Sequence, residues 1–214
     1  MSSRLHFGTD GWRSRVDTDF SADNVRKVAK AVAEFLVFSK PPGRGVFVGY
    51  DGRSSSRYFA EVCAEILATN NIPPLLPPRP VPTPIAAFTA VKHSLQGSIM
   101  ITASHNPPAY NGIKFIPYYG GPATTEITES IEYMIPTEVP YYESFDKLKQ
   151  RGIISILNPI EDYLRHIQQL LSIDAINIKV TIDPMHGASS GIMDEILRNL
   201  TAKVHVIRGN IDPF

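Results

Sequence analysis

The sequence has 214 residues, which is enough for one large domain or for one domain and part of another. Lys plus Arg and Asp plus Glu both number 21, so the chain has no broad positive field that would attract nucleic acid or an anionic membrane. It has no apolar run of about 18 residues, and its first residues lack the apolar core of a signal peptide. We therefore expect a cytoplasmic protein without nucleic-acid or membrane partners.

The first 70 residues alternate between helix and strand signals. After Ser21, a typical N-cap residue, apolar residues recur at helical spacing until the double proline at 41–42. Residues 46–50 form a short β-rich run, and a serine-capped helix is predicted from there to about Thr69. Cys63 falls on the apolar face of that helix, which predicts a packed core thiol rather than a nucleophile.

The segment 73–84 contains seven prolines. One interpretation is a polyproline segment that a partner recognises. The interpretation that we prefer is a rigid connector between a strand over residues 72–76 and a helix over residues 85–91. Thr83 followed by Pro84 supports it, because a cap followed by proline at the first helical position is a common helix start.

The middle of the chain predicts two strands, over residues 98–101 and 113–116, and then a helix over residues 126–134. The loop between the two strands contains Ser104. In open α/β sheets, ligands bind beyond the carboxyl ends of the strands, so a serine in this loop is a candidate reacting group.

The pattern weakens from residue 136 to 152, and we place a domain boundary near residues 150–157, with domains at 1–154 and 155–214. Asn158 and Pro159 predict a helix start, and a strand, a helix and a strand follow over residues 178–207, as in a parallel crossover. The predicted class is α/β, with three-layer α/β/α sandwich domains on mixed, mostly parallel sheets. About 60 residues are few for an independent core, so the second domain is expected to be incomplete.

Four residues in or after the serine loop could take part in chemistry. Ser104 lacks the flanking glycines of a Gly-x-Ser-x-Gly turn, so acyl transfer is not favoured. His105 is its direct neighbour, and on an extended segment the two side chains would point apart, which makes His105 a poor base for Ser104. Asn106 is typical of a turn. Lys114 lies within reach of the same crevice, although a solvated strand lysine is an alternative.

Two arginines outside this loop are candidates for binding phosphate. Arg13 follows an Asp10-Gly11 turn, where a backbone loop could aim its guanidinium at phosphate oxygens. Arg53 stands in a strand-to-helix loop, and a structural ion pair with Asp51 is a comparably good interpretation.

Five segments carry a resemblance to a known family. The longest reads Thr-Ala-Ser-His-Asn-Pro-Pro-Ala-Tyr-Asn-Gly-Ile-Lys at residues 102–114. On these segments the chain resembles the α-D-phosphohexomutases, the phosphoglucomutase and phosphomannomutase family, from about residue 5 to about residue 206. The other four are Phe-Gly-Thr-Asp-Gly-Trp-Arg at 7–13, Gly-Tyr-Asp-Gly-Arg-Ser-Ser-Ser at 49–56, Val-Pro-Thr-Pro at 81–84 and Asp-Pro-Met-His-Gly-Ala at 183–188.

The resemblance implies a phosphohexose mutase that interconverts hexose 1-phosphate and hexose 6-phosphate through a phosphoserine and a hexose 1,6-bisphosphate. It implies that Ser104 is the phosphoryl donor and acceptor, and that Lys114 and Arg13 serve in general acid/base catalysis. By the same resemblance, His105 is expected to contact the sugar or its phosphate. The expected substrate-binding residues are Asn106 and Arg53.

The resemblance also implies Mg²⁺, held in part by the phosphate on Ser104, and hexose 1,6-bisphosphate as activator. The family's Asp-x-Asp-x-Asp-Arg metal loop is not in this sequence and would follow Phe214. We therefore expect an inactive N-terminal fragment, whose partners are a phosphorylated hexose and the remaining domains of the parent chain. Trp12 favours glucose or mannose as the sugar. The alternatives are a phosphoglucosamine mutase and a non-catalytic sugar-phosphate-binding module.

Overall fold

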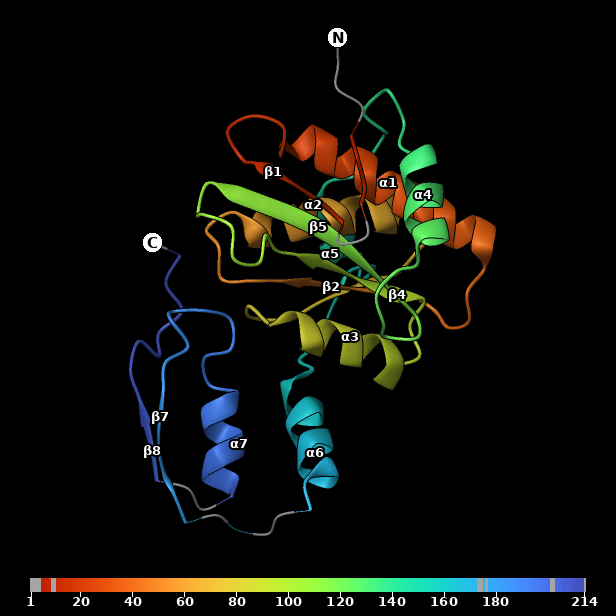
Figure 1. Cartoon of the computed structure of the whole chain (residues 1–214). Helices are drawn as coiled ribbons and strands as arrows, with labels where there is room; N and C mark the ends of the chain where they lie inside the picture. Colours follow the sequence, from red (N-terminus) through yellow and green to blue (C-terminus); the bar gives the residue numbers. More distant parts are fainter. Residues whose placement is uncertain (1–4, 9–10, 173–174, 176, 201–202, 214) are drawn as a thin grey trace.

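The computed structural model describes residues 5–8, 11–172, 175, 177–200 and 203–213 (Figure 1). Their strands form a six-stranded mixed sheet in the order β1-β5-β4-β2-β3-β6 and a two-stranded parallel sheet of β7 and β8. The elements in chain order are β1 (Trp12–Arg15), α1 (Ala22–Ser39), β2 (Val46–Tyr50), α2 (Ser56–Thr69), β3 (Pro74–Leu76), α3 (Thr83–Lys92), β4 (Gly97–Ile101), β5 (Tyr110–Pro117), α4 (Thr125–Tyr133), α5 (Phe145–Gln150), β6 (Ser155–Ile156), α6 (Ile160–Leu170), β7 (Lys179–Ile182), α7 (Met193–Asn199) and β8 (Lys203–Val206).

The large sheet is the middle layer of three, as the predicted fold class requires. Helices α1 and α2 cover one of its faces and α3 covers the other (Figure 1). Successive strand residues point to opposite faces, so Val46 and Val48 enter the core under α1 and α2, while Phe47 enters the core under α3. Both faces of β2 and β4 are buried, which explains why these strands are apolar at nearly every position.

The sheet is parallel at β4-β2-β3-β6 and antiparallel at β1-β5-β4. The antiparallel pair β4 and β5 carries the Ser104 loop between its strands, so that loop leaves and re-enters the same sheet. The prediction of two strands on either side of Ser104 is confirmed, and β5 extends beyond the predicted residues 113–116 at both ends.

Helix starts were predicted well where a side chain caps the helix and less well elsewhere. Ser21 Oγ accepts a hydrogen bond from Asn24 N at 3.3 Å, and α1 begins at the next residue, as predicted. Helix α3 begins at Thr83 with Pro82 as its N-cap residue, so the prediction of Thr83 as cap was wrong by one position. The short helix α5 was not predicted, because its one buried residue, Leu148, produces no helical period.

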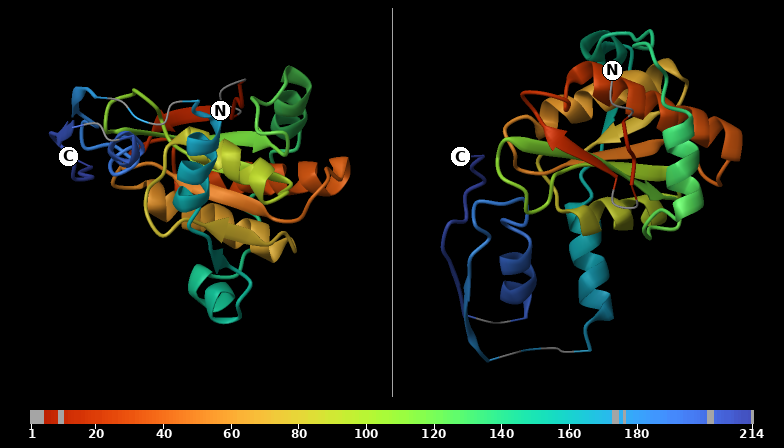
Figure 2. Two further views of the ribbon diagram at one scale, coloured as in Figure 1. Left: turned by 90° about the horizontal axis from the view of Figure 1, so that it is seen from below. Right: turned by 45° about the horizontal axis from the view of Figure 1, so that its top comes forward.

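The connection between the two sheets is close. Strand β6 pairs with β3 at the edge of the large sheet, and α6 then begins beside α3 and extends away from the large sheet (Figures 1 and 2). The helix start predicted at Asn158 and Pro159 is confirmed, and Ile160 and Leu164 of α6 are buried against the core under α3. Arg79 in the proline-rich segment also contacts the segment between β7 and α7, because its Nη2 donates to Ser190 O at 2.7 Å. The domain boundary between residues 154 and 155 stays a prediction.

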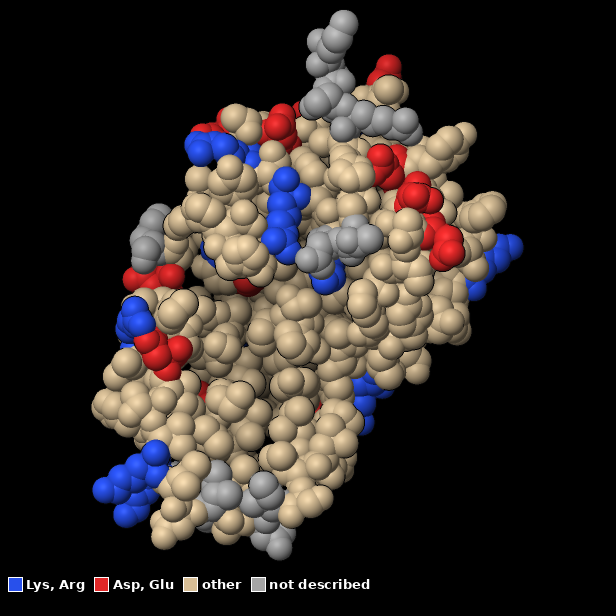
Figure 3. Space-filling model, in the orientation of Figure 1, with Lys and Arg blue, Asp and Glu red and all other residues tan. Residues whose placement is uncertain are grey.

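On the face shown in Figure 3, Lys, Arg, Asp and Glu side chains lie mainly around the margins, and a broad central area carries few of them. Within the described ranges, no helix combines the length and the apolar character needed to cross a membrane.

Candidate active site

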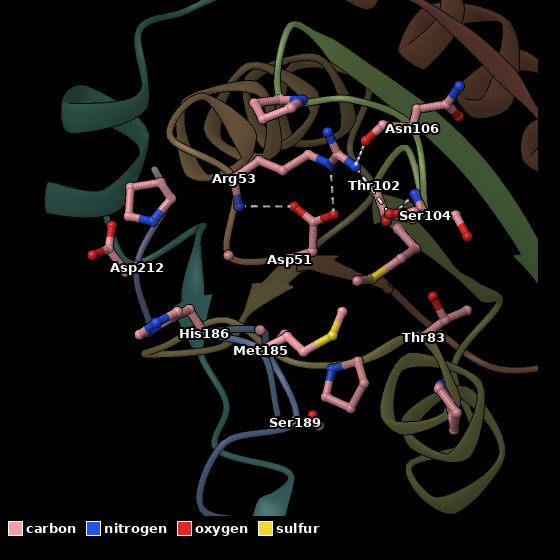
Figure 4. Close-up of a pocket in the computed structure, with 18 residues that line it drawn as sticks. Asp51, Arg53, Thr83, Thr102, Ser104, Asn106, Met185, His186, Ser189 and Asp212 are labelled. Atoms are coloured by element: carbon pink, nitrogen blue, oxygen red, sulfur yellow. Dashed lines mark hydrogen bonds and ion pairs between the residues drawn. The ribbon is translucent and has the colours of Figure 1, made fainter. Parts of the chain in front are cut away.

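A cavity of about 520 Å³ lies where the carboxyl ends of strands from both sheets meet. One wall comes from the loops after β2 and β4, with Asp51, Arg53 and Ser104. The other comes from the segment after β7, with Met185 and His186 (Figure 4). The remaining lining residues are Gly52, Pro82, Thr83, Pro84, Met100, Thr102, Asn106, Pro108, Gly187, Ala188, Ser189, Asp212 and Pro213.

Ser104 is exposed at this cavity and has a backbone φ of 55°, in the left-handed region. For a residue other than glycine this conformation costs about 1 to 2 kcal/mol, so surrounding contacts must hold it. One such contact is from Ser104 N to Thr102 Oγ1, at 3.0 Å. The loop therefore presents the serine hydroxyl outward on a strained turn.

His105 Nδ1 lies 3.4 Å from Ser104 Oγ. The expectation that neighbouring side chains point apart was wrong here, because Ser104 is not extended but left-handed, which turns the two side chains toward the same side. The structure thus brings an imidazole nitrogen to the hydroxyl that would react.

Arg53 lies beneath the Ser104 loop and makes the ion pair with Asp51 that the sequence left as an alternative. Its Nε donates to Asp51 Oδ2 at 3.3 Å, and its terminal nitrogens donate to backbone carbonyls of the Ser104 loop. Asp51 also accepts from Ser56 Oγ at 2.6 Å, at the start of α2. Asn111 Nδ2 donates to Ser56 Oγ at 3.0 Å, which ties the returning strand β5 into the same network.

Arg13 and Lys114 lie on one face of the large sheet, because Arg13 pairs with Gly112 in the register of β1 and β5 and Lys114 is two residues further on. Lys114 also pairs with Met100, a residue that lines the cavity. Among the described residues the cavity lining includes Ser104, Asn106 and Arg53 but not Arg13, His105 or Lys114. Asp10, which was expected to turn the chain toward Arg13, lies outside the described residues.

Gly112 explains how β1 approaches the serine loop so closely. A Cβ atom at this position would lie 2.5 Å from Thr102 O and 2.8 Å from Arg13 Cγ. Glycine is thus required for Arg13 to pack directly beside the start of the loop.

The second wall of the cavity was missed by the sequence reasoning. Met185 and His186 both have left-handed backbones, with φ of 50° and 59°. Three hydrogen bonds hold His186 there: its backbone N donates to Arg208 O at 3.1 Å, Nδ1 donates to Asn210 O at 2.9 Å, and its carbonyl accepts from Asp212 N at 3.1 Å. The side chain of Met185 points into the space between the walls (Figure 4). Two signals were available: these residues follow a predicted strand, which is where ligands bind in α/β proteins, and they belong to the family-like segment 183–188.

Asp183 and Cys63 are among the ionisable side chains outside the cavity whose pKa values are shifted. Arg208 donates two hydrogen bonds to Asp183, and they hold the pKa of that carboxyl group below its ordinary value. Burial raises the pKa of the Cys63 thiol, and this agrees with the predicted packed core cysteine. A thiol kept protonated in the core is not a nucleophile.

The described residues do not by themselves form a site for a divalent metal. No group of three or more His, Cys, Asp or Glu side chains among them could hold an ion. Asp51 faces the cavity, but its carboxylate oxygens already accept from Arg53 and Ser56. Because Mg²⁺ takes one or two carboxylates together with phosphate oxygens, further ligands would be needed here.

The sequence matches a model of a protein family over its first two thirds. Residues 4–141 match the model described as phosphoglucomutase/phosphomannomutase, alpha/beta/alpha domain I. The matched region covers β1 to α4 and contains the Ser104 loop, Arg13, Arg53 and Lys114.

Related proteins and structures agree with this match. A phosphoglucomutase of Staphylococcus saprophyticus is 34% identical over 207 residues, 92% of this chain and 37% of that protein. A phosphoglucosamine mutase of Cronobacter sakazakii is 31% identical over 99% of this chain and 47% of its own length. A crystal structure from Thermus thermophilus, provisionally described as a phosphomannomutase, has a TM-score of 0.86 at 29% identity, over 100% of this chain and 48% of the other. The chain spans less than half the length of each.

Proposed function

The chain belongs to the phosphoglucomutase/phosphomannomutase family, and on that premise we propose that the protein interconverts hexose 1-phosphate and hexose 6-phosphate through a phosphoserine at Ser104. The exposed Ser104 hydroxyl on a strained turn, at the mouth of a 520 Å³ cavity, is the observation that carries the proposal. A cavity of this size is suited to a phosphorylated sugar.

The proposed step moves a phosphoryl group from Ser104 Oγ to a free hydroxyl of the hexose phosphate. The Oγ–P bond breaks, a bond forms between phosphorus and the sugar oxygen, the hydroxyl proton passes to a base, and Ser104 Oγ regains a proton. The hexose 1,6-bisphosphate then returns its other phosphate to Ser104 by the reverse chemistry. Most of the catalysis in such a transfer is positioning and charge stabilisation.

We assign the charge-stabilising and proton-transfer roles to Lys114 and Arg13, which share a face of the sheet next to the loop. His105 lies close enough to Ser104 Oγ to take part in its protonation. Asn106, which lines the cavity, is the proposed contact for substrate, with Arg53 behind it. These roles rest on the placement of the residues and on the family resemblance.

Mg²⁺ and a hexose 1,6-bisphosphate activator belong to this proposal through the resemblance alone. When bound, the metal would neutralise charge on the transferring phosphate. A phosphate on Ser104 is the ligand that we propose for it from the described part of the chain. The proposed location is the cytoplasm.

Glucose and mannose are the proposed sugars, and glucosamine is the second candidate, since one relative is a phosphoglucosamine mutase of nearly the same identity. Trp12, which suggested the first two, is buried and stacks on Phe20 at 4.7 Å between ring centroids, so it packs the core and does not line the cavity.

The test is mutase activity of the native protein that contains this chain. Glucose, mannose and glucosamine 1-phosphates are supplied in parallel with Mg²⁺ and a trace of the matching 1,6-bisphosphate. Turnover is expected to disappear in Ser104→Ala and to persist in Ser39→Ala, an exposed serine at the far end of α1. If the folded, metal-loaded protein turns over none of the three sugars, the mutase proposal is wrong.

A further inference from the structure

Four backbone carbonyls of the Ser104 loop converge on one side chain. Arg53 Nη1 donates to Pro107 O at 2.9 Å and to Tyr110 O at 3.0 Å. Its Nη2 donates to Ser104 O at 2.9 Å and to Asn106 O at 2.7 Å. The loop therefore wraps around the guanidinium group.

All five N–H groups of the Arg53 guanidinium are engaged within the protein. The group carries five donors in a planar fork, and the fifth, on Nε, donates to Asp51 Oδ2 at 3.3 Å. A substrate phosphate could bind this group only by displacing a carbonyl of the loop or the carboxylate of Asp51. The Arg53 side chain is only 14% exposed, which fits a group enclosed by protein.

The guanidinium itself is fixed from the other side. Asp51, at the end of β2, accepts from Arg53 Nε, from Arg53 N at 3.1 Å and from Ser56 Oγ. Arg53 thus connects a rigid strand-to-helix junction to the Ser104 loop. It also donates to the carbonyl of Ser104, the residue with the strained backbone.

We infer that Arg53 is a positioning residue, which holds the Ser104 loop in the shape that presents the serine hydroxyl to substrate. The inference rests on the proposed phosphoryl transfer at Ser104, and it assigns Arg53 a structural contact with the loop in place of a contact with the substrate phosphate. Without the guanidinium, four convergent carbonyl groups would each lose the bond from Arg53, although Pro107 O would keep the bond from Tyr110 N. The loop would then open to satisfy the remaining carbonyls with water.

The test compares Arg53→Lys and Arg53→Gln with Arg57→Gln in the native protein that contains this chain. Arg57 is the matched control, because it lies four residues further along, in the first turn of α2, and pairs with Glu61 at 3.1 Å on the exposed side. Lysine keeps the charge of Arg53 but presents three donors from a single atom, so it cannot serve four carbonyls and a carboxylate.

The first readout is amide hydrogen exchange, which does not depend on catalysis. Asn106 N and Tyr110 N donate within the loop, to Ala103 O and Pro107 O. Their exchange is expected to accelerate about 10-fold or more in both Arg53 variants, with the amides of β2 and β4 unchanged. Unchanged loop exchange, or equal acceleration in the strands, would overturn the inference.

The second readout is the single-turnover phosphorylation of Ser104 by glucose 1,6-bisphosphate. A misplaced nucleophile lowers the maximal rate, so a fall of roughly 10- to 100-fold is expected in both variants, with the half-saturating concentration changed by less than about threefold. If Arg53 instead binds substrate phosphate, the half-saturating concentration rises, the maximal rate persists and lysine restores much of the binding. That outcome overturns the inference.

The two readouts separate this inference from the function on which it rests. If the unsubstituted protein takes no phosphoryl group from glucose, mannose or glucosamine 1,6-bisphosphate, the proposed function fails. The exchange measurement then still decides whether Arg53 holds the loop.

Discussion

Arg13 Nη1 lies 3.3 Å from Asn106 Oδ1, so two residues that are 93 positions apart in the sequence meet at the edge of the Ser104 loop. Arg13 belongs to strand β1 and Asn106 belongs to the loop. Of these two residues, Asn106 lines the cavity and Arg13 does not. The contact fixes a guanidinium next to the reactive loop.

Asn106→Ala is expected to lower the rate of Ser104 phosphorylation about fivefold, because it removes one acceptor of the Arg13 guanidinium, a bond worth about 1 kcal/mol. The measurement is single-turnover phosphate uptake. Asn24→Ala is the control, since its side chain bonds to Asp19 O at the start of α1. An Asn106→Ala rate equal to that of this control would contradict the prediction.

Gly112→Ala is expected to destabilise the fold by roughly 2 to 3 kcal/mol, because the new methyl group would overlap the Thr102 carbonyl and the stem of Arg13. The denaturant midpoint of unfolding measures this. Gly8→Ala serves as the matched substitution, because a Cβ there meets its nearest atoms at 3.8 Å. Equal midpoints for the two variants would show that the backbone can move aside.

Glu65→Gln is expected to cost roughly 1 to 3 kcal/mol of folding free energy, because it removes the buried charged partner of Arg26 and leaves that guanidinium only the more exposed Asp23 as a carboxylate partner. Glu65 Oε2 lies 3.3 Å from Arg26 Nη2, and both side chains are about one-tenth exposed. Glu61→Gln, on the same helix, breaks an exposed pair and should cost only about 0.5 kcal/mol. Thermal or denaturant unfolding of the two variants tests the contrast.

The Asp183–Arg208 pair is expected to make stability depend on acid pH. The folded pKa of Asp183 lies below its ordinary value of 3.8, mainly because Arg208 donates hydrogen bonds to the carboxylate. The contribution is therefore fully present above that ordinary value and is lost as the pH falls through the lower folded pKa. The unfolding free energy of the native protein should decline over this range more steeply than that of Asp183→Asn. Parallel profiles of unfolding free energy against pH for the two proteins would contradict this role of the Asp183–Arg208 pair.

The fold could be predicted from the sequence where local signals coincide with tertiary packing. The apolar period after Ser21 predicted α1, and the β-rich run at residues 46–50 predicted β2, both at nearly the bounds that the structure shows. The pairing order β1-β5-β4-β2-β3-β6 could not be predicted, because β1 joins β5 through contacts between segments about 100 residues apart.

The site could likewise be predicted only where local sequence signals determine it. The position of Ser104 in a loop after a strand follows from local patterns, and the structure confirms it. The ion pair of Arg53 with Asp51 was one of two interpretations of the sequence. The contacts of Arg53 with the loop could not be predicted, because those partners are backbone carbonyls, which leave no signal in the sequence. Met185 was missed because its place opposite Ser104 depends on how the second sheet sits against the first.

Because the two walls of the cavity belong to different sheets, the width of its mouth depends on the angle between those sheets. Ser104 follows β4 and Met185 follows β7 in the chain, while the joint between the sheets includes β6, α6 and the bond from Arg79 to Ser190 O. A small rotation at this joint would displace the cavity walls by more than it displaces the joint, because the walls lie further from the axis of rotation. The separation between Ser104 and Met185 would therefore report a rotation of one sheet relative to the other.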